Sequence, residues 1–217
     1  MKLILASGSE WRKKLLGWLE IPFEVVESGI AETALDDEEP SELVARLATT
    51  KAEKVADKLT NDMMEKHLDS DEGVVVIGAD TVIAVDGHII GKPKDKQDAE
   101  VIIQMLAGKE HEVWTGVAVV DPITGDRKVE AVVTKVRFRD IGAEELAIYL
   151  DTKEWEGKAG GYQVQGMVKK FITSIDGSYT NVIGLPLIVL GEFLEAMGVV
   201  IDVDIPEVIK EKTGYLS

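Results

Sequence analysis

The sequence predicts an α/β fold, in which helices flank a mixed sheet. Apolar stretches of strand length alternate along the chain with segments whose apolar residues recur at helical spacing. The stretches 111–120 and 129–140 are separated only by turn residues, which indicates an antiparallel pair. No repeat or low-complexity linker divides the 217 residues, so we expect one domain over 1–217, with any lobe boundaries near 20–40 and 140–160.

Strands are expected where apolar residues run together or alternate with polar ones. The long run 74–85 ends at Asp86-Gly87, a hairpin turn signal that leads into the next extended segment. In chain order, the expected strands are 3–6, 22–29, 74–85, 88–93, 111–120, 129–140 and the end of 158–177.

Helices are expected where apolar residues recur every three or four positions after a cap or a proline. Ser9 is a candidate cap for the first helix, and Pro40-Ser41 opens the longest. In chain order, the expected helices are 12–19, 41–59, 97–106, 142–151 and 185–197. The acidic stretch 31–40 and the polar stretch 60–73 are interpreted as loops, the latter with at most a short helical turn, and the tail after Met197 predicts no element.

The charge of the chain limits its partners. The formal net charge is −16, which disfavours binding to nucleic acid or to an acidic membrane surface. There is no cysteine and no apolar run of membrane-spanning length, so we expect a soluble protein of the reducing cytoplasm. A small phosphorylated ligand remains possible, because a local cluster of cations binds an anion at short range.

Several common site motifs fail on inspection. The stretch "GHIIGKP" imitates a phosphate-binding P-loop, but Asp86 replaces the first glycine and Pro93 the hydroxyl residue. The histidines His67, His88 and His111 are scattered, which argues against a histidine metal site. Neither a calcium loop nor a dinucleotide-binding glycine pattern is present.

Asp80 is the residue that fits its surroundings least. It lies in "VVVIGADTVIAV", where an ionised carboxylate is costly unless a cation, a metal or several hydrogen bonds compensate it. Gly78 and Ala79 leave room for a ligand or another backbone to approach. The functional interpretation is a catalytic or metal-binding carboxylate; the alternative is an aspartate that binds nearby backbone amides.

Three cations are candidates for binding an anion. Lys51 shares one side of its helix with apolar residues, although its stem could simply extend to water. Lys92 stands between Gly91 and Pro93, a rigid frame that could direct it into a cleft, although surface lysines are common there. Arg12 follows a Ser-Gly-Ser turn at a helix N-terminus, where free amides and the helix dipole favour an anion.

These pieces resemble the Maf family of nucleoside triphosphate pyrophosphatases from Leu3 to about Met197. Eight stretches carry the resemblance, in register: "LASGSEWR", Ala31-Glu32, "LATTKA", "IGADTVI", "GKPKD", "VWTGVAV", "KAGGYQVQG" and "NVIGLPL". The resemblance implies a cleft in a mixed α/β fold of the Maf and inosine-triphosphatase-like type, usually in a homodimer. It also implies hydrolysis of a nucleoside triphosphate to the monophosphate and pyrophosphate, with Mg²⁺ or Mn²⁺.

The resemblance also assigns roles to single residues. Asp80 matches the family's proton acceptor, and Glu32 and Asp80 are the expected metal ligands. Cations that neutralise a triphosphate and a base that activates water are what such a hydrolysis needs. The expected phosphate-binding residues are Ser7, Ser9, Arg12, Lys51 and Lys92, with Ser9 alternatively a plain helix cap.

Three positions bear on which base is bound. Thr81 and Gln165 match the branch of the family that hydrolyses dTTP and UTP, and an amide can both donate to and accept from a pyrimidine edge. Trp11 instead matches the branch that acts on 7-methyl-GTP, where it could stack on a base. We therefore expect dTTP and UTP, with modified pyrimidines possible. The alternatives are 7-methyl-GTP, or a sensor of nucleotides linked to cell division that does not hydrolyse them.

Overall fold

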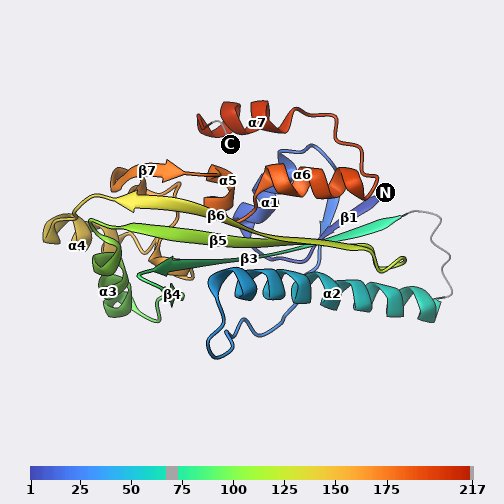
Figure 1. The fold of residues 1–217 in the computed structure, drawn as a ribbon, viewed down its shortest axis with the longest axis horizontal. Helices are drawn as coiled ribbons and strands as arrows, with labels where there is room; N and C mark the ends of the chain where they lie inside the picture. Colours follow the sequence, from blue (N-terminus) through green and yellow to red (C-terminus); the bar gives the residue numbers. More distant parts are fainter. Residues whose placement is uncertain (67–72, 216–217) are drawn as a thin grey trace.

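The computed structural model describes residues 1–66 and 73–215. Within them, long strands form one twisted sheet with helices on both faces (Figure 1). The strands are β1 (Lys2–Leu5), β2 (Phe23–Val25), β3 (Val74–Val85), β4 (His88–Ile90), β5 (Glu110–Val120), β6 (Arg127–Phe138) and β7 (Ile172–Asp176). The helices are α1 (Glu10–Gly17), α2 (Pro40–Lys66), α3 (Lys96–Leu106), α4 (Ala143–Asp151), α5 (Tyr179–Ile183), α6 (Leu187–Ala196) and α7 (Ile205–Thr213).

The sheet is mixed, as predicted. Its strand order is β2-β1-β3-β5-β6-β7, and β4 pairs with β3 beside that path. The three strands β2, β1 and β3 are parallel, whereas β5, β6 and β7 join them in antiparallel register. The predicted hairpin at Asp86-Gly87 and the predicted antiparallel pair are both confirmed.

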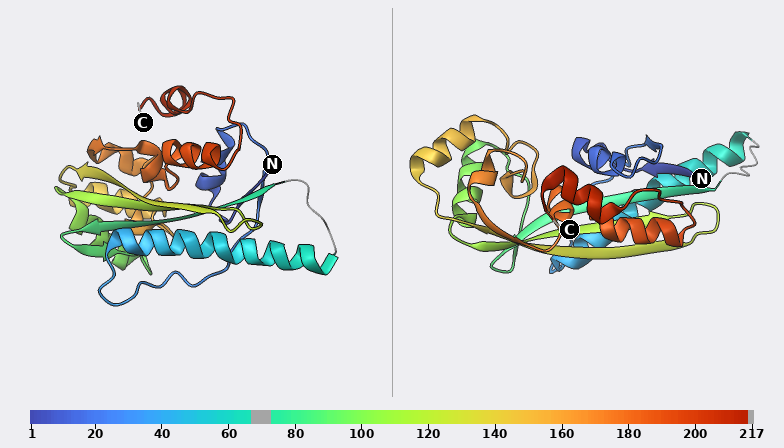
Figure 2. Two further views of the ribbon diagram at one scale, coloured as in Figure 1. Left: turned by 45° about the vertical axis from the view of Figure 1, so that its right-hand side comes forward. Right: turned by 90° about the horizontal axis from the view of Figure 1, so that it is seen from above.

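One half of the sheet carries a layer of helices on each face (Figures 1 and 2). On one face α2 packs on β1, β3 and β5 through small apolar side chains such as Ala48, Ala52 and Val55. On the other face α1, α6 and α7 cover the alternate residues of the same strands, including Val75 and Ile77. Successive side chains of β3 therefore enter two different cores.

The other half of the sheet has a core of its own. It is formed by the far ends of β3, β5 and β6 with α3, α4 and the turns around 159–171, and its largest buried side chains include Phe138, Tyr149 and Phe171. Because β3 and β5 run through both halves, these lobes share one continuous sheet.

The predicted elements differ from the structure in several places. The strands predicted at 22–29 and 88–93 are shorter, at Phe23–Val25 and His88–Ile90, and the predicted glycine-rich loop contains two 3-10 turns, at Ala159–Gly161 and Met167–Lys170. The helix predicted at 41–59 continues to Lys66, so the loop prediction for 60–73 is wrong for its first residues; the rest, including His67, lies almost wholly outside the described residues. The predicted first helix begins earlier, at Glu10, with Ser9 as its cap. Two short helices, α5 and α7, had no predicted counterpart.

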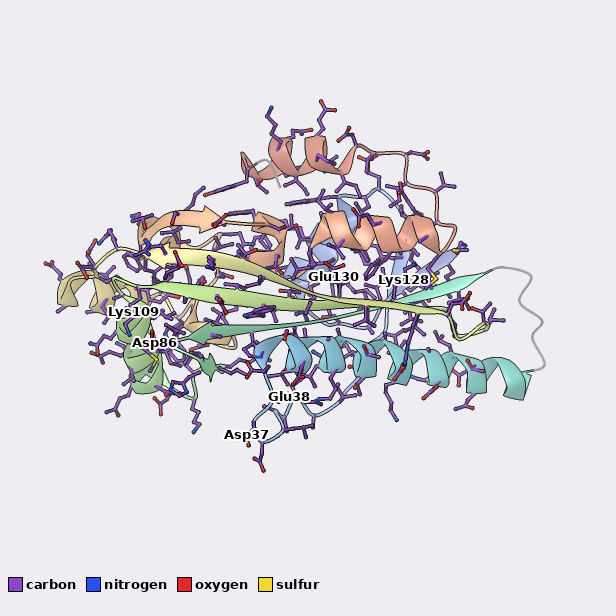
Figure 3. The ribbon with its side chains drawn as sticks, in the orientation of Figure 1. Asp37, Glu38, Asp86, Lys109, Lys128 and Glu130 are labelled. Carbon is purple, nitrogen blue, oxygen red and sulfur yellow. The ribbon has the colours of Figure 1, made fainter. Side chains whose placement is uncertain are left out.

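Charged side chains remain at the edges of this framework. Figure 3 shows Asp86 and Lys109 near the turn between β3 and β4, where they form an exposed ion pair of 2.6 Å. Across the described ranges, no helix combines the length and apolar character needed to cross a membrane.

Candidate active site

The pleat of β3 directs two neighbouring polar side chains to opposite faces of the sheet. Asp80 has the same parity as Gly78 and faces α2, whereas Thr81 faces α1 and α5. A Cβ atom on Gly78 or on Gly116, which pairs with Asp80, would collide with backbone carbonyls of α2. The two glycines therefore let α2 lie close to the sheet beside Asp80. Of the two neighbours predicted beside Gly78, a ligand or another backbone, the structure shows the backbone.

Lys51 of α2 lies between two carboxylates. Its Nζ donates to Asp80 Oδ1 at 2.6 Å and to Glu32 Oε1 at 2.5 Å. Glu32 Oε2 in turn accepts from Lys92 Nζ at 2.8 Å. Lys51 and Asp80 are only 4% and 6% exposed. The alternating charges compensate one another, which offsets the cost of burying the Asp80 carboxylate.

Glu32 comes from the acidic loop that precedes α2. Burial alone would raise its pKa, but the hydrogen bonds from Lys51 and Lys92 outweigh burial and lower the pKa of Glu32 to about 2. Arg46 fixes the loop, because it donates to Glu38 at 2.6 Å and to the carbonyl oxygen of Thr33 at 3.1 Å. The loop is therefore attached to α2, and it holds the ionised carboxylate of Glu32 beside Lys51.

Arg12 connects α1 to three other parts of the chain. Its guanidinium donates to the carbonyl oxygen of Gly184 at 2.8 Å, to Thr81 Oγ1 at 3.0 Å and to Ser7 Oγ at 3.3 Å. Burial lowers the pKa of Arg12, while the charges of Asp80 and Glu32 raise it. Ser9 caps α1 by accepting from the backbone N–H of Arg12. The cap predicted at Ser9 is therefore confirmed, and the anion site at the same turn stays a prediction.

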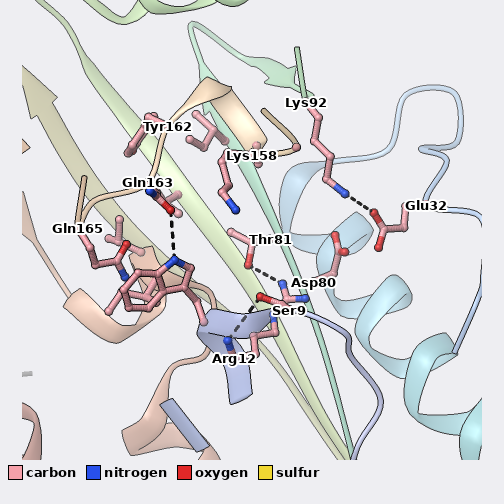
Figure 4. Close-up of a pocket in the computed structure, with 17 residues that line it drawn as sticks. Ser9, Arg12, Glu32, Asp80, Thr81, Lys92, Lys158, Tyr162, Gln163 and Gln165 are labelled. Atoms are coloured by element: carbon pink, nitrogen blue, oxygen red, sulfur yellow. Dashed lines mark hydrogen bonds and ion pairs between the residues drawn. The ribbon is translucent and has the colours of Figure 1, made fainter. Parts of the chain in front are cut away.

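These side chains line two adjoining hollows that share Ser9, Arg12, Glu32 and Lys92. We call the first part the charged end; it is formed by Ser7, Arg12, Glu32, Lys51, Asp80 and Lys92. We call the second part the amide end; it is formed by Trp11, Ile83, Tyr162, Gln163, Gln165 and Val182. In Figure 4, Glu32 and Lys92 lie on one side of the pocket, Gln163 and Gln165 on the other, with Arg12 and Thr81 between them.

The amide end combines apolar walls with few polar groups. The indole Nε1 of Trp11 donates to Gln163 Oε1 at 3.2 Å, and Lys14 holds its ammonium 4.6 Å from the centroid of the Trp11 ring. The amide nitrogen Nε2 of Gln165 is buried, and it has no hydrogen-bond partner among the described residues. A buried donor without a partner is uncommon and indicates a place for a ligand acceptor.

A second polar pair stabilises the wall of this end. Tyr162 shares a hydrogen bond of 2.7 Å with Nε2 of His111, and both side chains are buried. Burial lowers the pKa of His111 to about 4, so the imidazole is neutral at neutral pH. Tyr149 reaches the same glycine-rich turn and donates to the carbonyl oxygen of Gly161 at 2.7 Å.

The charged end has donors suited to a divalent cation. Oxygens of Glu32 and Asp80 lie within 2.6 Å of the same atom, Lys51 Nζ, so two carboxylates already converge. Mg²⁺ commonly takes one or two carboxylates together with phosphate oxygens and water. Over residues 1–66 and 73–215, no group of three or more His, Cys, Asp or Glu side chains is placed to bind a metal. The residues therefore fit a cation that enters together with a phosphorylated ligand.

The structure gathers all the predicted site residues around one pocket. The lining residues that were not predicted include Lys158 and Gln163, both in the glycine-rich stretch that carries Gln165. Lys158 points into the pocket in Figure 4, and its ammonium has no ion pair or hydrogen bond within the described part of the chain. Both residues lie in "KAGGYQVQG", one of the stretches that carry the family resemblance, but the stretch has no periodicity that would distinguish them from its other residues.

Comparison with known proteins identifies the family. The model of the family described as Maf-like protein matches residues 2–197. The dTTP/UTP pyrophosphatase of Syntrophus aciditrophicus (strain SB) is 41% identical over 197 residues, which cover 91% of this chain and 90% of that protein. The dTTP/UTP pyrophosphatase of Alkaliphilus metalliredigens (strain QYMF) is also 41% identical, covering 89% and 94%. That of Chelativorans sp. (strain BNC1) is 43% identical, covering 86% of each protein. The chain belongs to the Maf family.

Proposed function

We propose that this member of the Maf family hydrolyses dTTP and UTP between the α- and β-phosphates, releasing the monophosphate and pyrophosphate. The observation that carries the proposal is the buried Lys51–Asp80 pair beside Glu32 and Lys92 at one end of a pocket whose other end is apolar and amide-lined. Relatives that carry the name dTTP/UTP pyrophosphatase support the same substrates.

In this mechanism Asp80 acts as the general base. One of its oxygens, Oδ1, accepts from Lys51, while Oδ2 accepts no hydrogen bond from the described residues and is available to a water molecule. Asp80 takes a proton as the water oxygen bonds to the α-phosphorus. The bond from that phosphorus to the oxygen bridging to the β-phosphate then breaks, and pyrophosphate leaves.

The cations of the pocket neutralise the phosphate chain. Arg12 is held rigidly by its three hydrogen bonds, so its guanidinium is oriented before substrate binds. Lys92 is paired with Glu32 but is half exposed, with 54% of its side chain accessible, so it can exchange Glu32 for a phosphate oxygen. Ser7 and Ser9 add hydroxyl groups at the N-terminus of α1.

Glu32 and Asp80 would hold the divalent cation, Mg²⁺ or Mn²⁺, together with substrate oxygens. When bound, such an ion neutralises the charge that develops on the phosphate oxygens. The ionised state of Glu32 over the whole neutral range suits this role, because its pKa lies at about 2.

The amide end would bind the base. Gln165 offers an unpartnered donor, and Ile83, Val113 and Val182 offer apolar contacts. Lys14 supports a pyrimidine over 7-methyl-GTP, because a positively charged methylguanine stacked on Trp11 would share that ring with the Lys14 ammonium. The methylguanine alternative is therefore disfavoured, and a panel of nucleotides tests both it and a relaxed preference.

The proposal extends to the setting of the enzyme. The proposed role is the removal of unwanted or modified pyrimidine triphosphates, a house-cleaning role. The absence of cysteine favours the reducing cytoplasm, and the acidic net charge disfavours nucleic acid and membrane surfaces as partners. A homodimer is proposed from the family resemblance alone and is tested by light scattering on the purified protein.

The test is turnover by purified protein with UTP, dTTP, CTP, 7-methyl-GTP and GTP, each with Mg²⁺ or Mn²⁺. We expect pyrophosphate from UTP and dTTP, and a loss of at least about 100-fold in kcat for Asp80→Asn. Asp86→Asn makes the same chemical change at an exposed aspartate outside the pocket and should leave turnover unchanged.

Two outcomes would overturn the proposal in different ways. Turnover by Asp80→Asn at the wild-type rate would remove Asp80 from the mechanism. If the wild type bound nucleotides but released no pyrophosphate from any of them, the chain would be a sensor rather than an enzyme.

A further inference from the structure

Gln163 occupies a position at the amide end whose orientation is chemically determined. The indole nitrogen of Trp11 is only a donor, so the atom that faces it at 3.2 Å must be the amide oxygen of Gln163. The amide nitrogen of Gln163 then turns away from Trp11, and it donates to no other described residue. Gln163 lines the same pocket as Gln165.

The amide end therefore contains two amide nitrogens without an acceptor among the described residues. Gln165 Nε2 is fully buried, and Gln163 Nε2 is fixed by the bond on its other side. Leaving a buried donor unpaired is unfavourable, so Gln165 favours a ligand acceptor, and Gln163, which lines the same pocket, offers a second donor beside it. Apolar side chains around them, including Ile83 and Val182, suit a flat ring that carries those acceptors.

The pyrimidine bases differ in the hydrogen-bond acceptors that their edges present. Uracil and thymine present two carbonyl oxygens, O2 and O4, on either side of the N3–H donor. Cytosine presents an amino group in place of O4, so a donor would face a donor there. A site with two amide donors thus favours the keto bases over cytosine.

We propose that Gln163 is a further specificity-determining residue, whose amide nitrogen donates to O4 of uracil or thymine. Trp11 is its positioning residue, because the indole N–H fixes which way the amide points. Trp11 thus contributes to the selection of a keto pyrimidine indirectly, by orienting Gln163. This inference rests on the proposed function, since it names how the same pocket selects its base.

The test is the ratio of kcat/KM for UTP to that for CTP. Gln163→Glu keeps an acceptor for Trp11 but replaces the amide nitrogen by a carboxylate oxygen, which repels O4 of uracil and accepts from the amino group of cytosine. We expect the ratio to fall by at least about tenfold, mainly through KM. Gln163→Leu, which adds no charge, should lower the ratio by a smaller factor because it removes the donor alone.

Trp11→Phe tests the positioning role. It keeps an aromatic ring but removes the N–H, so the Gln163 amide is free to rotate and the ratio should fall less than in Gln163→Glu. Gln104→Glu makes the same change as Gln163→Glu on the exposed surface of α3 and should leave the ratio unchanged.

Binding of UMP and CMP, measured by calorimetry, gives the same comparison without turnover. An unchanged UTP to CTP ratio in both Gln163 variants, together with unchanged UMP to CMP binding, would overturn the role of Gln163 while leaving the hydrolysis intact. A wild type that releases no pyrophosphate but whose Gln163 variants lose preference for UMP would overturn the proposed reaction and keep this inference.

Discussion

At the charged end of the pocket each carboxylate is bound by a lysine, whereas at the amide end a donor of Gln165 is buried and finds no partner in the described part of the chain. A triphosphate that enters the charged end must exchange partners, because Lys51 and Lys92 already bind Glu32 and Asp80. A base that enters the amide end only adds partners. The charged end is therefore stable by itself, and the amide end is completed by the ligand.

This difference separates two kinds of residue. Those of the charged end contribute to folding as well as to chemistry, because removing one leaves its partner as a buried charge without a counter-ion. Those of the amide end contribute mainly to binding, because substituting them removes few interactions from the free protein. Substitutions at the two ends should consequently have different ratios of stability loss to activity loss.

The largest effect is expected for Lys51→Met. The change leaves Asp80 buried without its cation and Glu32 with only Lys92, so we expect a loss of about 3–5 kcal/mol in the free energy of unfolding. Turnover should fall as well. Urea unfolding measures the first quantity, with Lys58→Met on the exposed side of α2 as the matched control.

A double variant shows whether the stranded charge is the cause. Lys51→Met combined with Asp80→Asn should regain most of the lost stability without regaining turnover. If the double variant is as unstable as Lys51→Met alone, packing around Lys51 rather than the Asp80 charge determines stability at this end.

A smaller loss in the free energy of unfolding, about 3 kcal/mol, is expected when the pH is lowered, because of His111. This residue supports the amide end through its hydrogen bond with Tyr162. Burial lowers the pKa of His111 from its ordinary 6.5 to about 4, so between these values the unfolded chain binds a proton that the folded chain does not. Stability should therefore fall as the pH drops from 6.5 to 4.

The measurement is the free energy of unfolding at pH 7 and pH 4. His111→Gln retains a partner for Tyr162 but does not titrate, so its loss over this range should be smaller than that of the wild type by the amount above. His88→Gln, at an exposed position, should behave as the wild type. Equal pH dependence of His111→Gln and the wild type would show that His111 titrates normally.

The smallest effect on stability is expected for Lys158→Met, since this ammonium has no partner within the described ranges. An ammonium that binds a phosphate oxygen supplies a charge-assisted hydrogen bond, so kcat/KM should fall by about 30-fold for UTP and CTP alike. Unfolding should be unchanged. Lys169→Met, on an exposed turn, is the control, and a change in the UTP to CTP ratio would place Lys158 at the base instead.

Two kinds of feature could be predicted from the sequence: charged residues within apolar segments, and elements with a regular apolar pattern. Asp80 in an apolar strand and Lys51 on an apolar helix side are unusual in any fold, and the structure pairs them at 2.6 Å. The strand β3 and the hairpin after it follow from a continuous apolar run and a turn signal.

Other features depend on tertiary contacts that the pattern does not contain. Glu32 is one acid among many in its loop, and only the attachment of that loop through Arg46 brings it to Lys51. Lys158 and Gln163 lie in turns without periodicity, where no local rule says which side chain faces a pocket. The helix α7 was missed although Asp204 and Gly214 are capping residues at its two ends.

Attack of water on the α-phosphorus beside Asp80 is the step on which the function of the charged end depends. Hydrolysis of UTP in ¹⁸O-labelled water, followed by mass spectrometry of the products, locates the attacked phosphorus. We expect the label in UMP and none in pyrophosphate. Label in pyrophosphate, or release of orthophosphate and UDP, would show that the charged end directs water to a different phosphorus.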